Sequence, residues 1–187
     1  MTIIICPGIH EQALTDRFVS QLFGDSSNNI NYPNILIPPS EGILPISGLH
    51  LLHFLNQNIG DKQTTPITFI SFSAGVVGAF IAANLWELQG GKIRTFIAMD
   101  GWGVPLFANF PIYRFSHDYF THWTSLLLGG GKANFYAEPS VNHLEMWSNP
   151  QAVKGIYIGL STVNLPEQIT GKASDFLHLI LNNKEEK

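Results

Sequence analysis

PITFISFSAGVVGAF, residues 66–80, is an apolar run that leads through small residues around Ser73 into a segment of helical character. An apolar run without alternation is typical of a strand buried on both faces of a parallel sheet. Ser71, Ala74 and Gly75 are small, as a close approach between a strand and the following helix requires. The stretch therefore predicts a sharp strand-to-helix turn that lifts the Ser73 hydroxyl out of the sheet.

Strands and helices alternate on both sides of this stretch. We expect strands at residues 2–6, 34–37, 66–72, 93–99, 112–115 and 134–137, and helices at 16–23, 48–58, 74–88 and 120–128, with Thr15 and Ser47 as caps of the first two helices. Two amphipathic segments follow, near residues 151–160 and 174–181. Alternation of this kind favours right-handed crossovers and a mainly parallel sheet covered on both faces. The expected fold class is α/β, a three-layer sandwich with a mainly parallel sheet of about six strands.

Size and composition fit one domain over residues 1–187. Hydrophobic residues make up 45% of the chain and charged residues 13%, which indicates a compact globular protein and excludes a disordered one. The net charge of -4 and the few Lys and Arg residues argue against a nucleic-acid partner. No stretch is long and apolar enough to suggest a membrane span. Cys6 is the one cysteine and no signal-peptide pattern is seen, so a cytoplasmic location is expected.

Polar residues follow several of the predicted strands. Ser73, Asp100, Asp118 and His143 each lie in a loop just after one of them. Sites in parallel sheets form where the carboxyl ends of the strands meet loops, so one edge of the sheet should collect all four side chains.

The order of serine, carboxylate and histidine, each after a successive strand, resembles the α/β-hydrolase family over nearly the whole chain. In this comparison Ser73 occupies the nucleophile elbow, with Ser71 in place of the first Gly of G-x-S-x-G. The resemblance implies a small member without a lid domain and a catalytic triad in which Ser73 attacks an acyl carbon and His143 carries the proton. It also implies an esterase or thioesterase type of serine hydrolase that needs no metal or organic cofactor.

Two carboxylates can complete such a triad. Asp118 is preferred, because it follows the strand before the last one and leaves room for a helix and a strand before His143. Asp100 is the alternative, because it ends the strand that should lie beside the nucleophile strand. The family's oxyanion hole corresponds here to the backbone N–H of Ala74 together with that of Ile9 or Gly8.

Other residues near the same edge have simpler interpretations. His117 and His122 flank Asp118 but complete no set at known ligand spacing, so no metal is expected. The glycines at 129–131 precede a strand and lack the phosphate-loop frame, and Cys6 is expected to pack inertly. The aromatic residues Trp102, Phe107, Phe110, Trp123 and Trp147 are expected mainly in the core. If some of them line a pocket beside Ser73, its ligand is apolar.

The sequence thus predicts hydrolysis of a small ester, thioester or amide, a small-molecule acyl substrate, through an acyl-enzyme on Ser73. Two alternatives stay open. One is a non-catalytic protein of the same fold that binds an apolar ligand or a partner. The other is an acyltransferase, which shares the acyl-enzyme step.

Overall fold

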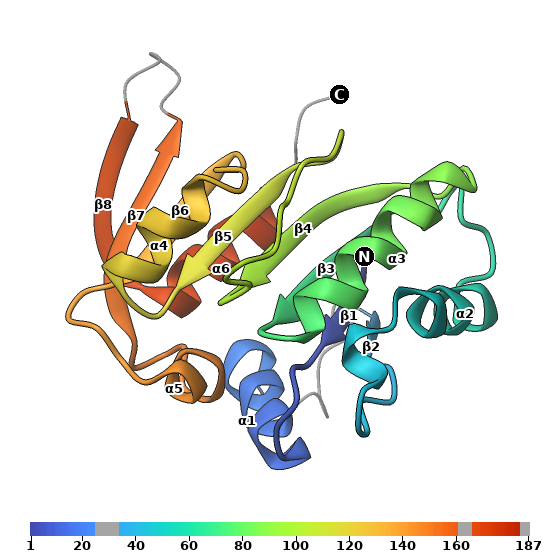
Figure 1. Ribbon diagram of the computed structural model, residues 1–187, viewed down its shortest axis with the longest axis horizontal. Helices are drawn as coiled ribbons and strands as arrows, with labels where there is room; N and C mark the ends of the chain where they lie inside the picture. Colours follow the sequence, from blue (N-terminus) through green and yellow to red (C-terminus); the bar gives the residue numbers. More distant parts are fainter. Residues whose placement is uncertain (25–33, 161–165, 184–187) are drawn as a thin grey trace.

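The computed structural model describes residues 1–24, 34–160 and 166–183, and within them the strands form a single sheet (Figure 1). Its eight strands run in the order β2-β1-β3-β4-β5-β6-β7-β8. Their bounds are β1 (Thr2–Cys6), β2 (Asn34–Leu36), β3 (Ile67–Phe72), β4 (Ile93–Met99), β5 (Ile112–Ser116), β6 (Ala133–Ala137), β7 (Lys154–Leu160) and β8 (Pro166–Lys172). The strands from β2 to β6 pair in parallel, and β7 and β8 are antiparallel additions.

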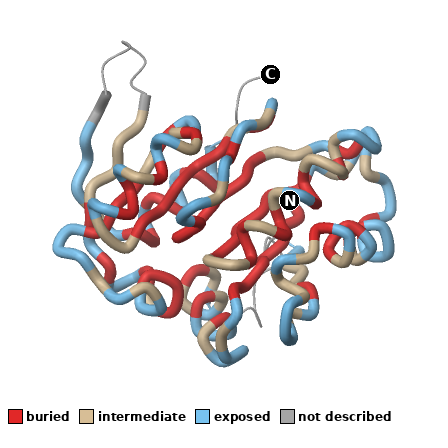
Figure 2. Tube along the Cα trace, viewed as in Figure 1, coloured by how far each residue is buried: buried red, intermediate tan, exposed pale blue. Residues whose placement is uncertain are grey.

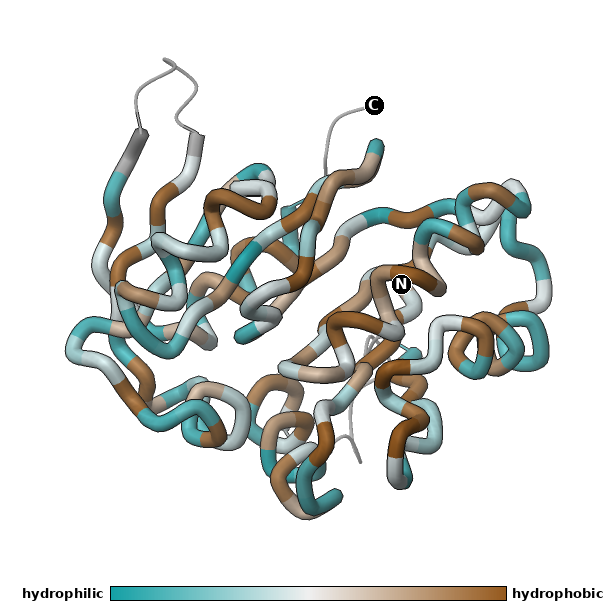
Figure 3. Tube along the Cα trace, in the orientation of Figure 1, coloured by the Kyte–Doolittle hydropathy of each residue, from teal (hydrophilic) through white to brown (hydrophobic). Residues whose placement is uncertain are grey.

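Helices cover both faces of the sheet. They are α1 (Gln12–Phe23), α2 (Gly48–Asn58), α3 (Gly75–Leu88), α4 (Tyr119–Leu126), α5 (His143–Ser148) and α6 (Ala173–Asn182), with a short 3-10 turn, η2 (Leu44–Ile46). Buried side chains of α1, α5 and α6 pack on one face, and those of α2 and α3 pack on the other. Successive residues of a strand point to opposite faces, so Phe69 joins the second cluster and Ile70 the first. Buried and hydrophobic residues accordingly follow the central strands (Figures 2 and 3).

The α/β class and the mainly parallel sheet are confirmed, but the expectation of about six strands is wrong in number. The described residues form eight strands, and the two additional strands, β7 and β8, make the sheet mixed. The segment near residues 151–160 contains β7, and β8 was not expected at all. β8 reads PEQITGK, which is polar and begins with proline. A strand at the edge of a sheet tolerates such residues because one of its sides makes no ladder hydrogen bonds, so its sequence lacks the signal of a central strand.

The first helix begins earlier than expected. Thr15 is not its cap, because α1 starts at Gln12 after the cap position Glu11. Thr15 is instead fully buried, and its Oγ1 accepts a hydrogen bond from the indole Nε1 of Trp147 at 3.3 Å. This bond ties α1 to α5, the helix that begins at His143. Ser47 does cap α2, its hydroxyl accepting from the N–H of His50 at 3.3 Å.

Cys6, the last residue of β1, is buried in the cluster that faces α2 and α3. Burial raises the pKa of its thiol, so the sulfur stays protonated and unreactive, as the sequence predicts for a packing residue. None of the helices in the described part of the chain is long and apolar enough to cross a bilayer.

The register of the parallel strands brings their carboxyl ends level. Phe72 of β3 pairs with Met99 of β4, and Met99 pairs in turn with Phe115 of β5. The residues that follow these strands are therefore neighbours at one edge, as predicted from the order of the elements.

Candidate active site

Ser73 lies at the turn between β3 and α3 with a φ of 52°. Its N–H donates to the carbonyl of Met99 at 2.9 Å, and its own carbonyl accepts from Val76 at 3.1 Å as the helix begins. A positive φ is unfavourable for any residue with a Cβ, and such strain clusters at functional sites. Among the non-glycine residues that the structure describes, only Ser73 and Asp100 have a positive φ, 52° in each case.

Small residues let the loop after β1 press against this turn. A Cβ at Gly75 would lie 2.3 Å from the carbonyl oxygen of Pro7, and one at Gly8 would lie 3.0 Å from the Cβ of Ser73. Ser71 fits as well, because its buried hydroxyl donates to the carbonyl of Ile97 at 3.0 Å. The buried Ser71 hydroxyl therefore has a hydrogen-bond partner within the sheet.

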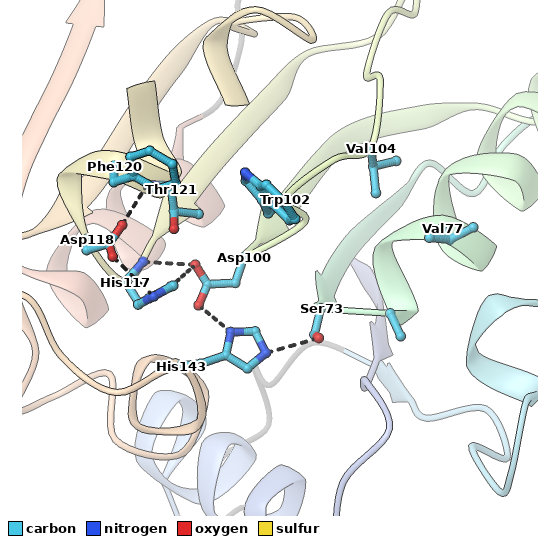
Figure 4. A pocket seen from close by; sticks show the side chains of 11 residues that line it. Ser73, Val77, Asp100, Trp102, Val104, His117, Asp118, Phe120, Thr121 and His143 are labelled. Carbon is cyan, nitrogen blue, oxygen red and sulfur yellow. Dashed lines mark hydrogen bonds and ion pairs between the residues drawn. The ribbon is translucent and has the colours of Figure 1, made fainter. Parts of the chain in front are cut away.

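His143 links Ser73 to Asp100 (Figure 4). Its Nε2 lies 3.0 Å from the Ser73 Oγ, and its Nδ1 lies 2.9 Å from Oδ2 of Asp100. His143 is the first residue of α5, whose start is capped by Asn142 through a 3.0 Å bond to the N–H of Leu144. The Asp100 side chain is 1% exposed and that of His143 is 40% exposed. The imidazole of His143 thus reaches the surface, while the Asp100 carboxylate is shielded from water.

Asp118, preferred as the acid from sequence, is used differently. Its Oδ1 accepts from the N–H of Thr121 at 2.6 Å and so caps α4, and its Oδ2 lies 3.4 Å from Nε2 of His117. The first N–H groups of a helix have no partner within the helix, which is why an aspartate at this position turns toward them. The contact with His143 that was expected of Asp118 is made by Asp100, the alternative acid.

His117 also belongs to this cluster of side chains, although the sequence did not indicate it. Its backbone N–H donates to Oδ1 of Asp100 at 2.8 Å, and its ring Nδ1 lies 3.1 Å from the same oxygen. Its ring is 5.7 Å from that of His143, centre to centre, at 79°. The available signal was its position directly after β5, beside the strand that carries Asp100.

Asp100 and His117 stabilise the charged forms of each other. Burial alone would raise the pKa of Asp100, but its contacts with His117 and His143 outweigh burial and lower that pKa below 3.8. The contact with Asp100 raises the pKa of His117 above 6.5, with the charge of Asp118 adding to the effect and burial opposing it. Asp100 therefore stays ionised despite being buried.

Aromatic rings support the imidazole of His143. The ring stacks on Phe72, with centroids 4.7 Å apart and planes 26° apart, and Phe72 stacks in turn on Trp147 at 5.1 Å. His10 also stacks on Phe72, at 5.5 Å, and burial together with the charge of His143 lowers the pKa of His10. Phe72 precedes Ser73 directly, so the residue of β3 that leads into the turn also packs against the imidazole of His143.

A cavity of about 510 Å³ opens over Ser73, Asp100 and His143. The rest of its wall is formed by Ala74, Val77, Trp102, Val104, His117, Asp118, Phe120 and Thr121 (Figure 4). Trp102 is held by a 3.0 Å hydrogen bond from its Nε1 to the Thr124 hydroxyl. Of the aromatic residues considered from sequence, Trp102 lines the cavity and Phe107 and Trp123 are exposed, whereas Phe110 and Trp147 lie in the core.

A buried arginine fixes the segment that carries Trp102 and Val104. Arg114 of β5 donates to the carbonyl of Val104 at 3.0 Å, and to those of Leu128 and Gly129 at 2.9 and 2.5 Å. Burial lowers the pKa of its guanidinium to about 10, so the group stays charged at neutral pH. Arg114 therefore links the loop after β4 to the segment that follows α4. Both the loop after β4 and α4 contribute residues to the cavity wall.

The three residues predicted to form an oxyanion hole lie beside Ser73 in different ways. Ala74 occupies the N-cap position of α3 and lines the cavity. Gly8 is buried against Ser73 and Phe72. Ile9 is 62% exposed and lines a second cavity, of about 750 Å³, between the loops after β1 and β2. Their role as donors stays a prediction.

Donor atoms of Asp100, His117 and His143 lie within 4.8 Å of one another, close enough to hold a metal ion. Within this group, Asp100 lies 3.1 Å from Nδ1 of His117 and 2.9 Å from Nδ1 of His143, and the expectation that no metal binds here stays a prediction. His122, the other histidine considered as a ligand, stacks on Tyr136 with centroids 4.9 Å apart, and burial lowers its pKa.

The sequence was compared with protein-family models and with curated proteins. No protein-family model matches the chain, and no curated protein matches it. The case for an activity therefore rests on the side chains described above.

Proposed function

We propose that the protein is a serine hydrolase of the α/β-hydrolase type, with Ser73 as nucleophile, His143 as general base and Asp100 as the acid. The observation that carries this proposal is the continuous contact from Ser73 Oγ through His143 to Asp100, at 3.0 and 2.9 Å, beside a cavity. Strained backbone at both ends of this relay adds support, because a fold retains such strain where a site requires it.

In the proposed reaction, Nε2 of His143 takes the proton of Ser73 while Oγ bonds to the acyl carbon of the substrate. The tetrahedral intermediate collapses, the bond to the leaving group breaks, and His143 gives its proton to that group. Water then repeats the sequence on the acyl-enzyme and releases the acid. Asp100 accepts from Nδ1–H of His143 throughout, which keeps the correct tautomer and stabilises the imidazolium.

Negative charge develops on the carbonyl oxygen of the substrate in this step. We assign its stabilisation to the N–H of Ala74 and to one N–H from Gly8 or Ile9. Ala74 supports this assignment because it caps the start of α3, where the helix dipole is positive.

The substrate class follows from the cavity. Val77, Trp102 and Phe120 form apolar wall next to the nucleophile. Such a wall favours an ester, thioester or amide with an apolar acyl group. An acyltransferase would use the same acyl-enzyme, and product analysis with water and with an added alcohol as acceptors separates the two activities.

A fluorophosphonate probe tests the proposal without knowledge of the substrate, because it reacts with serines activated by a base. The wild type should become labelled, and Ser73→Ala should not. Ser20→Ala, which alters an exposed serine of α1, is the matched control and should label like the wild type. A folded wild type that resists labelling would refute the proposal and favour a non-catalytic binding protein.

A further inference from the structure

We propose that His117 is a positioning residue of this site, which holds the carboxylate of Asp100 so that one oxygen always faces His143. The inference rests on the proposed function, since it assigns a task within the same relay. His117 touches neither the serine nor the reacting carbon in this role, and acts through Asp100.

The two oxygens of Asp100 are divided between two histidines. Oδ2 lies 2.9 Å from Nδ1 of His143, while Oδ1 accepts from the backbone N–H of His117 at 2.8 Å and lies 3.1 Å from its ring Nδ1. A carboxylate bound at one oxygen only can rotate about its Cβ–Cγ bond. Fixing Oδ1 opposes this rotation and keeps Oδ2 directed at the base. At 1% exposure, the Asp100 side chain has little access to water molecules able to replace His117.

The far side of the His117 ring is held as well. Its Nε2 lies 3.4 Å from Oδ2 of Asp118, whose other oxygen caps α4. The ring therefore stands between two carboxylates, one from the end of β4 and one from the start of α4 (Figure 4). Asp118, which is not placed to orient His143, gains a task in this arrangement. It anchors the residue that orients Asp100.

The charge state of His117 bears on the reaction too. The charged and titratable groups that face it are Asp100, Asp118 and His143. A proton on His117 offsets the charge of the buried Asp100 carboxylate, whose Oδ1 lies 3.1 Å from its ring Nδ1. Replacing His117 by a neutral side chain removes this compensating charge.

Two substitutions separate positioning from mere packing. In His117→Asn the amide nitrogen sits near the place of Nδ1 and keeps a polar contact with Asp100, whereas His117→Ala removes the ring contact and leaves only the backbone N–H on Oδ1. His178→Ala, in an exposed position on α6, is the matched control. For each protein we would measure the rate constant of fluorophosphonate labelling against pH, kcat and KM for a short p-nitrophenyl ester, and the midpoint of thermal unfolding.

We expect His117→Ala to lower kcat and the labelling rate by about tenfold to a hundredfold, the size of effect that follows from a misplaced catalytic group. The loss should fall mainly on kcat, because the contact that His117→Ala removes is the one with Asp100. A change in KM would report the loss of His117 from the cavity wall. His117→Asn should regain most of the rate. His178→Ala should match the wild type.

Each contrary outcome has a distinct meaning. If wild type and His117→Ala label at the same rate, the role of His117 is refuted while the proposed function stands. If His117→Asn and His117→Ala lose rate equally and both unfold at lower temperature, His117 only supports the fold and the inference is wrong. If the wild type itself does not label, the proposed function fails and the inference fails with it.

Discussion

Nδ1 of His143 lies 2.9 Å from Oδ2 of Asp100, the residue that follows β4, and β4 pairs with the strand that leads into Ser73. From the sequence, the preferred acid was Asp118, which follows the next strand, β5. His117 and Asp118 follow β5. His117 faces Asp100, and Asp118 faces His117 and the N–H of Thr121 at the start of α4. The carboxylate therefore reaches the base from β4, and the residues after β5 support it from behind.

Replacing each carboxylate by its amide should separate these roles. Asp100→Asn cannot hold the imidazolium of His143, and we expect kcat to fall on the order of a thousandfold or more. Asp118→Asn keeps an oxygen that can cap α4 and should cost no more than about tenfold. Steady-state kinetics on an active ester measures both losses. A larger loss at Asp118 would restore the assignment made from sequence and refute the one made from geometry.

The sequence was sufficient to place the functional side chains at one edge of the sheet, because strand order and loop position depend on local patterns. It was not sufficient to choose between Asp100 and Asp118, which both follow strands at that edge. The choice depends on where each carboxylate turns, and Asp118 turns to the free N–H of Thr121. Contacts such as His143 on Phe72 are equally invisible to sequence patterns, since they join residues far apart in the chain.

Phe72 should contribute to catalysis beyond its share in the core. Phe72→Leu removes the ring on which His143 stacks, so we expect kcat to fall several-fold and stability to fall by about 1–3 kcal/mol. Phe69→Leu is the matched control, because Phe69 is equally buried in β3 but packs on the opposite face. Urea unfolding and ester hydrolysis are measured together. Similar losses of stability with equal activity in the two variants would show that the ring has no role at the site.

Gly8 tests the contact between the loop after β1 and the serine turn. In Gly8→Ala the new methyl group would lie 3.0 Å from Cβ of Ser73 and 3.1 Å from the carbonyl oxygen of Phe72. The loop must move, and the proposed oxyanion donors move with it. We expect kcat to fall by about tenfold or more, toward the loss seen when one such donor is removed.

The control is Gly60→Ala, since a Cβ at Gly60 meets no atom within 4 Å. Its kcat should equal that of the wild type. Equal activity of both alanine variants would argue that the loop does not shape the site.

The contacts of His117 predict how stability depends on pH. Its pKa is raised above 6.5 by Asp100 and Asp118, so its contribution is complete below about pH 6.5 and is lost as pH rises through the folded-state value. The difference in unfolding free energy between wild type and His117→Asn should therefore be larger near about pH 5 than near about pH 9.

Asp100 sets the lower limit of this window. Its pKa is lowered below 3.8, so its own contribution is lost only as pH falls through that lowered value. Denaturant titrations over this range measure the difference between the two proteins. A difference that stays constant, or that grows toward high pH, would contradict a protonated His117 between two carboxylates.

Trp102 should set the preference for the acyl group. Each methylene that enters an apolar pocket contributes up to about 0.8 kcal/mol, so kcat/KM of the wild type should rise by as much as about fourfold per carbon until the cavity is full. Trp102→Ala removes part of the apolar wall and should flatten this rise across a series of p-nitrophenyl esters. Trp102→Phe lacks the hydrogen bond to Thr124 but keeps an aromatic wall, so most of the rise should remain.

Trp123→Ala alters an exposed tryptophan of α4 that is not part of the cavity wall, and should leave the rise unchanged. If the rise survives in Trp102→Ala and is lost in Trp123→Ala, the acyl group binds outside this cavity, along the exposed face of α4.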